Sequence, residues 1–285
     1  MTVKEYVSPR NLQETADFLN SYSGPAKLLA GGTDLLIQLS GDKNSETGLI
    51  SLKNLNELKE ISLIHSTEVF IGSMARHTDV AHSPLVNQHF PALAKASSLV
   101  GSPSIRNMAT LGGNICNASP SAETAPPLMI YDARVLIWNP SGEREIAIEN
   151  FFSGPSMNIL EKGEILKGFL LKPQNKLVAD YEKLGIRKAM EISIVNVGIS
   201  MIRTSDNICS QVRIALGAVA PTPIRARKAE AVLLNKKVTP SLIEKAAEVA
   251  KSEANPISDI RASADYRNDM IGLMVKNMMT KFSSL

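Results

Sequence analysis

The fold class follows from nine residues, Lys27-Leu28-Leu29-Ala30-Gly31-Gly32-Thr33-Asp34-Leu35. A short apolar strand enters two glycines, and Leu35–Leu39 then begins a helix that we expect to be buried, with Thr33 or Asp34 as its N-cap. This arrangement places several backbone N–H groups in one concavity at the positive end of a helix dipole. Because glycine has no Cβ to block a close approach, the turn suits a phosphate or pyrophosphate. A tight turn that binds nothing is the alternative.

This first glycine segment differs from two common nucleotide-binding motifs. It does not fit the dinucleotide pattern G-x-G-x-x-G, and no lysine follows the glycines as the P-loop requires. A nicotinamide-binding Rossmann domain is therefore disfavoured.

A second glycine pair lies in Thr110-Leu111-Gly112-Gly113-Asn114-Ile115-Cys116-Asn117-Ala118-Ser119-Pro120-Ser121-Ala122-Glu123. Its hydroxyl, amide and carboxylate side chains can bond phosphate oxygens and sugar hydroxyls. The whole stretch 101–127 is predicted to fold as a shaped loop that lines something, and a surface loop held by Asn and Ser turns is the alternative. Cys116 either neighbours a ligand or packs as a small buried hydrophobe. Two glycine segments in one chain favour an extended ligand held from both ends.

Farther along the chain, a change of composition at 171–176 indicates a domain boundary. Three strand-like runs follow it, at Tyr181–Leu184, Ile192–Ile202 and Ile208–Val219. Two helices are then predicted, one with Thr239 as N-cap and Pro240 at its first position, and one over Tyr266–Phe282 with methionines on its buried side.

Composition excludes several classes of protein. The chain has 285 residues, a net charge of +3 and 44% hydrophobic residues, which is ordinary for a globular protein of about two domains. This charge is too small to indicate nucleic acid or a membrane surface as a partner. Cys116 and Cys209 cannot supply the four thiolates of an iron–sulfur cluster. His77 and His82 are not spaced as metal ligands, so we expect surface or hydrogen-bonded core histidines and no metal site. Without a predicted signal peptide or membrane span, the expected compartment is the cytoplasm.

Both glycine segments resemble the two flavin-binding signatures of the FAD subunit of molybdenum hydroxylases, the family of xanthine, carbon monoxide and nicotinate dehydrogenases. Three later stretches look like the C-terminal domain of that family: Tyr181–Ser193, Leu216–Pro223 and Ser263–Arg267. The resemblance covers nearly the whole chain. It implies an α+β fold, with a two-subdomain FAD-binding domain similar to that of vanillyl-alcohol oxidase over residues 1–175 (subdomains about 1–55 and 56–175). A smaller antiparallel sheet with helices would occupy 176–285.

The resemblance also implies the cofactor contacts. The backbone of residues 27–35 would bind the FAD pyrophosphate. Thr110, Gly113 and Asn114 would make further contacts with the phosphates and the flavin. Glu123 would bond hydroxyls of the ribityl or adenosine part, Leu166 would lie against the adenine, and Lys183 would lie against the flavin. Cys116 and Glu123 depart from the usual family residues, which are an aliphatic side chain and Asp. The full set is Lys27, Leu28, Leu29, Ala30, Gly31, Gly32, Thr33, Asp34, Leu35, Ala109, Thr110, Gly113, Asn114, Cys116, Asn117, Ala122, Glu123, Leu166 and Lys183.

In this family the substrate is oxidised at a molybdopterin centre on a large subunit. Electrons then pass through two iron–sulfur clusters on a small subunit to FAD, and on to NAD or another acceptor. The resemblance thus implies an electron-transfer subunit within a dimer of heterotrimers, with no catalytic side chain of its own. The substrate, whether purine, aldehyde, N-heterocycle or carbon monoxide, is not specified. Two alternatives are a self-contained FAD oxidase, for which the C-terminal part looks too small, and a scaffold that has lost the cofactor, against which the intact glycines argue.

Overall fold

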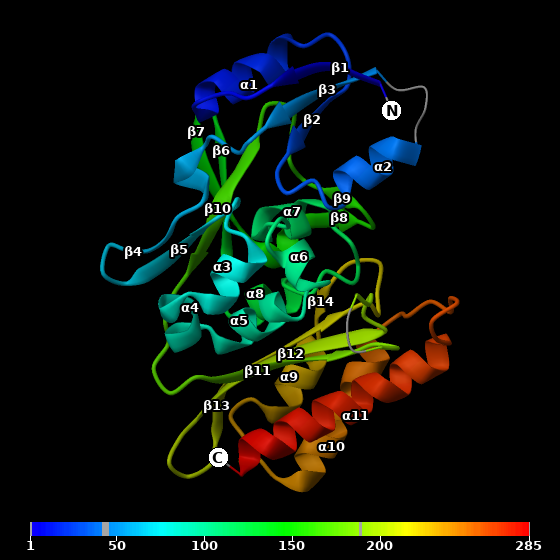
Figure 1. The fold of residues 1–285 in the computed structure, drawn as a ribbon. Helices are drawn as coiled ribbons and strands as arrows, with labels where there is room; N and C mark the ends of the chain where they lie inside the picture. The colour runs from blue at the N-terminus through cyan, green and yellow to red at the C-terminus, as the bar shows by residue number, and fades with distance from the viewer. Residues whose placement is uncertain (1, 42–45, 188–189, 285) are drawn as a thin grey trace.

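The computed structural model describes residues 2–41, 46–187 and 190–284. Within them, three main sheets follow one another along the long axis of the molecule (Figure 1). Lys188 and Ala189, which belong to one of the family motifs, lie outside the described residues. The predicted α+β fold, with an antiparallel sheet and helices at its C-terminal end, is confirmed.

The first sheet is parallel, with strand order β1-β3-β2, and it consists of β1 (Thr2–Val7), β2 (Ala26–Leu29) and β3 (Glu46–Ser51). Helix α1 (Leu12–Ser21) connects β1 to β2, and the side chain of its N-cap, Asn11, accepts the N–H of Glu14 at 2.8 Å. Helix α2 (Leu35–Gly41) begins where the sequence predicts a helix. The expectation that it is buried is wrong, because Leu39 is its one buried residue and Ile37 is 71% exposed. A sheet of three short strands offers this helix little surface to cover.

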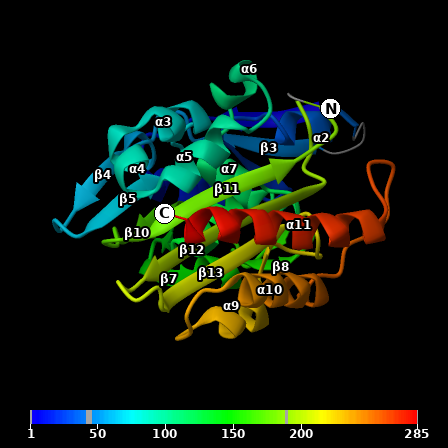
Figure 2. The same ribbon diagram turned by 90° about the horizontal axis from the view of Figure 1, so that it is seen from below.

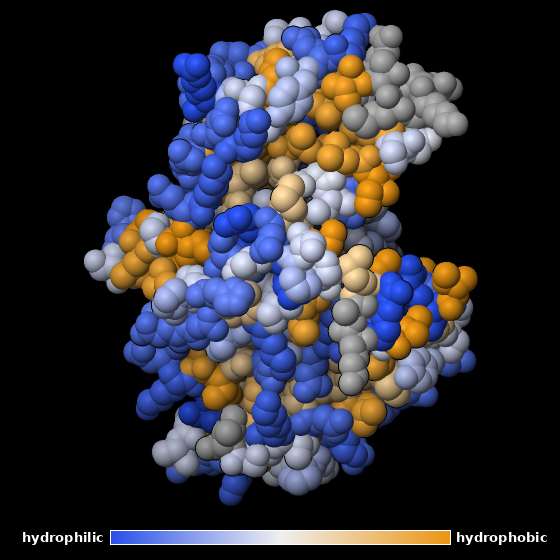
Figure 3. All heavy atoms as spheres, viewed as in Figure 1, coloured by the Kyte–Doolittle hydropathy of each residue, from blue (hydrophilic) through white to orange (hydrophobic). Residues whose placement is uncertain are grey.

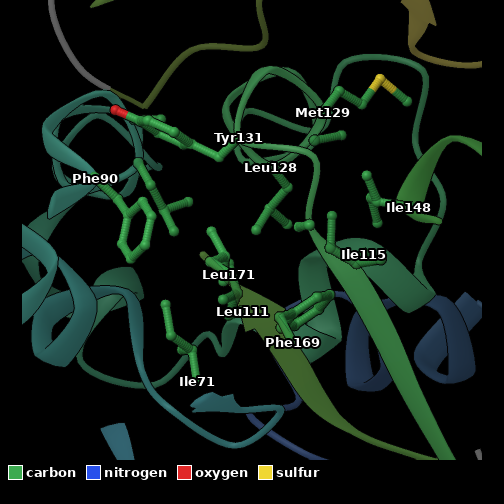
Figure 4. Close-up of a cluster of buried hydrophobic side chains, with 14 of the residues drawn as sticks. Ile71, Phe90, Leu111, Ile115, Leu128, Met129, Tyr131, Ile148, Phe169 and Leu171 are labelled. Atoms are coloured by element: carbon green, nitrogen blue, oxygen red, sulfur yellow. The ribbon is translucent and has the colours of Figure 1, made fainter. Parts of the chain in front are cut away.

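The second sheet is antiparallel and supplies the main core. Its strand order is β4-β5-β10-β6-β7, and its strands are β4 (Ile61–Ile64), β5 (Glu68–Gly72), β6 (Arg134–Asn139), β7 (Gly142–Ala147) and β10 (Ile165–Leu171). Six short helices lie between β5 and β6 in the chain, namely α3 (His77–His82), α4 (Pro84–His89), α5 (Pro91–Ser98), α6 (Pro103–Arg106), α7 (Leu111–Cys116) and α8 (Ala125–Ile130), and α4 and α7 contact the sheet directly. Ile71 and Phe169 from the sheet meet Leu111 and Leu128 from the helices in this core (Figure 4).

Smaller elements complete this region. They are 3-10 turns at Asn56–Leu58 and Ile148–Asn150, and a hairpin of β8 (Phe152–Gly154) and β9 (Met157–Asn158). About half of the predicted loop over 101–127 is helical, in α6, α7 and the first residues of α8. Ser102 and Thr110 act as N-caps of α6 and α7, and proline stands in the first turn of α6 and of α8. These helix-start signals outweigh the small, polar composition of the stretch.

The C-terminal sheet is antiparallel in the order β11-β12-β13-β14, with strands β11 (Val178–Leu184), β12 (Val195–Arg203), β13 (Cys209–Gly217) and β14 (Ile224–Arg225). Helices α9 (Arg227–Leu233), α10 (Pro240–Glu253) and α11 (Ala264–Ser283) cover one face (Figure 2), while α5 and α8 lie on the other. Thr239 caps α10 as predicted, and Met274, Met278 and Met279 lie on the buried side of α11. No described helix combines the length and apolarity needed to cross a membrane.

Candidate functional site: a cavity between two glycine turns

The first glycine turn needs its two glycines for different reasons. A Cβ on Gly31 would lie 2.1 Å from the carbonyl oxygen of Met108, so the turn packs directly on the backbone that precedes the second glycine pair. Gly32 has φ +74°, in the left-handed region that favours glycine. Helical hydrogen bonding then begins, since the N–H of Leu36 donates to the carbonyl of Gly32 at 3.1 Å. The N–H groups just before Leu36 therefore stand at a helix start, where the helix itself offers them no acceptor.

The second glycine pair begins α7. The hydroxyl of its N-cap, Thr110, accepts the N–H of Gly113 at 3.0 Å. Gly112 packs against the segment after β5, because its N–H donates to the carbonyl of Ser73 at 2.8 Å and a Cβ there would lie 2.5 Å from the Cβ of Ser73. Gly113 faces the first turn instead, where an added Cβ would stand 4.0 Å from the Cβ of Ala30. The glycine with space toward the other turn is thus Gly113.

Between the two turns lies a cavity of about 590 Å³, within the usual size of a cofactor site. Most of the predicted contact residues line it: Lys27, Leu28, Ala30, Gly31, Gly32, Thr33, Asp34, Leu35, Ala109, Thr110, Gly113, Asn114, Cys116, Asn117 and Leu166. Leu29, Ala122, Glu123 and Lys183 are not among its lining residues and stay predictions as cofactor contacts. The structure therefore brings two segments 80 residues apart in the chain, together with Leu166, around one space.

The sequence prediction missed a third wall of this cavity. Ser156, Asn158 and residues 160–165 line it alongside Leu166. The Asn158 side chain ties this wall to α7, because its Nδ2 donates to the carbonyl of Cys116 at 2.8 Å and its Oδ1 accepts the N–H of Leu160 at 3.0 Å. Other lining residues that were not predicted are Leu19, Ala26, Gln38, Leu52, Ser73, Met74, His77, Val100, Ile105 and Gly112. Of these residues, only Gly112 could have been predicted from the sequence as a lining residue, because it belongs to the second glycine pair.

His77 is neither a surface histidine nor a hydrogen-bonded core histidine, so that expectation is wrong. It is fully buried, and neither ring nitrogen has a hydrogen-bond partner among the described residues. Burial, and then the nearby positive charge of Arg106, lowers its pKa to about 4. The imidazole at this part of the cavity wall is therefore neutral at pH 7.

Cys116 is a half-buried thiol on the cavity wall. Loss of solvation raises its pKa to about 12, so the thiol stays protonated at neutral pH. This supports the interpretation of Cys116 as a small hydrophobe, packed against the core at the cavity wall.

Glu123 and Lys183 form a shielded ion pair that joins the segment before α8 to β11. The Lys183 Nζ lies 2.9 Å from Glu123 Oε1, and their side chains are 4% and 12% exposed. Lys183 also donates to the carbonyls of Glu191 at 3.0 Å and Leu99 at 3.3 Å. The next residue, Thr124, connects this pair to the cavity, because its hydroxyl donates to Oδ1 of the lining residue Asn114 at 2.6 Å.

Two protein-family models match the chain. The FAD binding domain in molybdopterin dehydrogenase matches residues 2–171, and the CO dehydrogenase flavoprotein C-terminal domain matches residues 180–282. These matches define the class: a flavoprotein component of molybdopterin-dependent dehydrogenases.

Individual relatives match this chain over nearly its whole length. The chain is 36% identical to a putative xanthine dehydrogenase FAD-binding subunit of Escherichia coli, over 97% of this chain and 96% of that protein. It is 33% identical to the carbon monoxide dehydrogenase medium chain of Hydrogenophaga pseudoflava, over 96% and 95%. The solved carbon monoxide dehydrogenase of H. pseudoflava superposes with a TM-score of 0.92 at 33% identity, over 96% of this chain and 95% of that one. Quinoline 2-oxidoreductase of Pseudomonas putida gives 0.91 at 28% identity, over 98% and 96%.

The chain therefore belongs to the family of FAD-binding medium subunits of xanthine dehydrogenase-type and carbon monoxide dehydrogenase-type molybdenum hydroxylases. It is an oxidoreductase subunit, and the predicted family resemblance is confirmed.

Proposed function

We propose that this chain holds FAD in the cavity between its two glycine turns and transfers electrons for a multi-subunit molybdenum hydroxylase. The observation that carries the proposal is the convergence of residues 30–35 and 109–117 on one cavity. The residues present fit the cofactor, because Gly31 lets the two turns pack closely and Gly113 leaves the space between them open. In this proposal residues 1–175 form the FAD-binding domain and residues 176–285 the C-terminal domain.

Each wall then has a part in binding. Backbone N–H groups at the start of α2 face the pyrophosphate, an arrangement that favours negative charge. The first N–H groups of α7 already donate to Ala75, Ser73 and Thr110, so α7 contributes the open space at Gly113 and its side chains. Leu166 lies against the adenine, Lys183 lies against the flavin, and Glu123 lies toward hydroxyls of the ribityl or adenosine part. Because Lys183 and Glu123 already bond each other, the cofactor would share these groups with the protein.

The redox chemistry belongs to FAD when it is bound, since an isoalloxazine accepts and releases electrons. The chain's own side chains bind and orient the cofactor. His77 stays neutral and Cys116 stays protonated at pH 7, so neither titrates where the enzyme works. This supports the proposal that the chain supplies no general acid or base.

The proposed partners are a molybdopterin-binding large subunit and a small subunit with two iron–sulfur clusters, in a dimer of heterotrimers in the cytoplasm. With two cysteines, this chain cannot bind such clusters through thiolates. Exposed apolar side chains at the rim of the cavity support a docked partner: Leu36, Ile37, Met108 and Met157 each neighbour a lining residue in the sequence and are 41–71% exposed. Figure 3 shows apolar residues gathered on the face that carries α2. NAD or another acceptor would take the electrons onward.

The first experiment is an absorbance spectrum of the purified chain from about 300 to 600 nm, with identification of any cofactor released by heat. A two-banded flavin spectrum that releases FAD is the expected result. A colourless chain that also fails to take up added FAD would contradict the proposal and favour a scaffold without cofactor. Turnover by the isolated chain with a small substrate would instead favour a self-contained oxidase.

A further inference from the structure

The third wall of the cavity is built on a tight turn, Glu161-Lys162-Gly163-Glu164, which leads into β10. The N–H of Glu164 donates to the carbonyl of Glu161 at 3.1 Å, and Gly163 has φ +86°, as the third position of a type II turn requires. All four residues line the cavity. The conformation of this turn therefore shapes the space open to the cofactor.

A buried carboxylate holds the turn to the central sheet. Arg144 on β7 donates from Nε to Oε1 of Glu164 and from Nη2 to Oε2, both at 2.7 Å. Glu164 Oε2 also accepts the N–H of Glu161 at 2.9 Å, so one carboxylate closes the turn and anchors it. The Glu164 side chain is 7% exposed, and Arg144 is not among the residues that line the cavity.

The electrostatics favour a fully ionised pair. The hydrogen bonds from Arg144 hold the pKa of the Glu164 carboxyl below its ordinary value, against the opposing effect of burial. A bidentate guanidinium–carboxylate pair also fixes geometry in a plane, which a lysine cannot reproduce. Replacing Glu164 by Gln removes the charge and one acceptor oxygen, and replacing Arg144 by Lys removes the two parallel hydrogen bonds. Either change weakens the contact that holds the turn to β7.

We propose that Arg144 and Glu164 are positioning residues for FAD. Both Glu164 oxygens already accept hydrogen bonds from the protein, so the pair acts through the turn, by setting the wall that runs into Leu166. The inference rests on the proposed function, in which Leu166 lies against the adenine. It follows that the pair governs affinity for the adenosine half of the cofactor and leaves the flavin half unaffected.

The neighbouring strand offers a matched control. Arg134 on β6 forms ion pairs with Glu68 and Glu145, its side chain is 37% exposed like that of Arg144, and it does not line the cavity. Replacing either arginine by lysine keeps the positive charge and removes the planar fork. The two substitutions differ in one respect. The guanidinium of Arg144 binds a residue of the cavity wall, whereas the guanidinium of Arg134 binds Glu68 and Glu145, which do not line the cavity.

The experiment compares the full-length apo chain with its Glu164→Gln, Arg144→Lys and Arg134→Lys variants. Dissociation constants for FAD, ADP and FMN are measured at a temperature where circular dichroism shows every variant folded. For Glu164→Gln and Arg144→Lys, we expect the constants for FAD and ADP to rise roughly tenfold, as for a lost charged hydrogen bond. FMN binding should stay unchanged, and Arg134→Lys should bind all three ligands like the wild type.

Three outcomes would overturn the positioning role. The first is unchanged FAD and ADP binding in both pair variants. The second is an equal loss of FMN and ADP affinity, and the third is a similar loss in Arg134→Lys; either of these would indicate a general structural effect. A wild-type chain that binds no FAD would differ from all three, because it would overturn the proposed function and the positioning role with it.

Discussion

The two Gly-Gly pairs look alike in the sequence, yet the fold uses them differently. In the first pair, Gly31 permits backbone-to-backbone packing and Gly32 permits a left-handed conformation. In the second pair, Gly112 packs on Ser73, whereas Gly113 has ordinary helical geometry and faces open space toward Ala30. Gly31, Gly32 and Gly112 are therefore required by the backbone packing or conformation, whereas Gly113 keeps the cavity open. Substitutions at these positions should separate loss of stability from loss of the cofactor.

The largest effect on stability is expected for Gly31→Ala. The new Cβ would lie 2.1 Å from the Met108 carbonyl oxygen and 2.9 Å from the Cα of Ala109, and backbone cannot yield as a flexible side chain can. The free energy of unfolding should fall by about 3 kcal/mol or more in urea denaturation of the apo chain. Gly41→Ala is the control, because a Cβ there meets no atom of the described residues within 4 Å. Equal midpoints for the two variants would mean that the two turns do not pack as described.

Gly32→Val should combine a moderate loss of stability with complete loss of FAD. A β-branched residue at φ +74° is strained by about 1–2 kcal/mol, and its Cβ would also crowd the side chains of Leu36 and Leu29 at 3.0–3.1 Å. Flavin absorbance after gel filtration measures retention, and urea denaturation measures the strain. Gly142→Ala, at φ +138° in open space, tests conformational strain away from the cavity and should keep its flavin.

Gly113→Val should release FAD with little change in the fold. Valine suits a helix at least as well as glycine. Its Cβ would lie 3.0 Å from the Thr110 hydroxyl and 4.0 Å from the Cβ of Ala30, so apo stability should stay within about 1 kcal/mol of the wild type. The side chain would occupy the space toward Ala30 that the pyrophosphate needs. Flavin absorbance and apo denaturation together test this separation. If the purified variant keeps stoichiometric yellow flavin, the cofactor is not held between the two turns.

The sequence was sufficient for the parts of the site that are local. A strand, two glycines and a helix start follow one another within residues 27–35, and the cap of α7 is carried by Thr110 itself. The C-terminal helices were equally local, since Thr239-Pro240 marks the start of α10. Such features need no knowledge of which distant segments meet.

The third wall could not be predicted, because it depends on strand register. Arg144 reaches Glu164 only because β6 lies between β7 and β10, with Ile137 opposite Arg144 on one side and opposite Leu166 on the other. No pattern in the sequence near these residues predicts the register of β6 with β7 and β10. The unpartnered burial of His77 is likewise a result of tertiary packing, since an isolated histidine in a sequence carries no signal of its surroundings.

The smallest effect at pH 7 is expected at His77, which lies beside the second glycine pair. Its backbone N–H donates at 3.0 Å to the carbonyl of Ala109, three residues before Gly112. Its pKa is about 4 in the fold against 6.5 as the ordinary value. Between these values the unfolded chain binds a proton that the folded chain does not, so stability falls as pH falls. From pH 7 to pH 5 this group should remove about 2 kcal/mol of the free energy of unfolding.

The His77→Leu variant should not show this loss of stability between pH 7 and pH 5. At pH 7 its free energy of unfolding should lie within about 1 kcal/mol of the wild-type value. Urea denaturation of both apo chains at pH 7, 6 and 5 measures the difference. Carboxylates whose pKa values are lowered, such as Glu164, Asp180 and Asp259, lose their contribution at more acidic pH, because their ordinary values are already 3.8–4.5. They therefore contribute little to the difference in this window. Parallel pH profiles for the two chains would show that His77 is solvated or partnered in solution, and that the wall behind the second glycine pair is open to water.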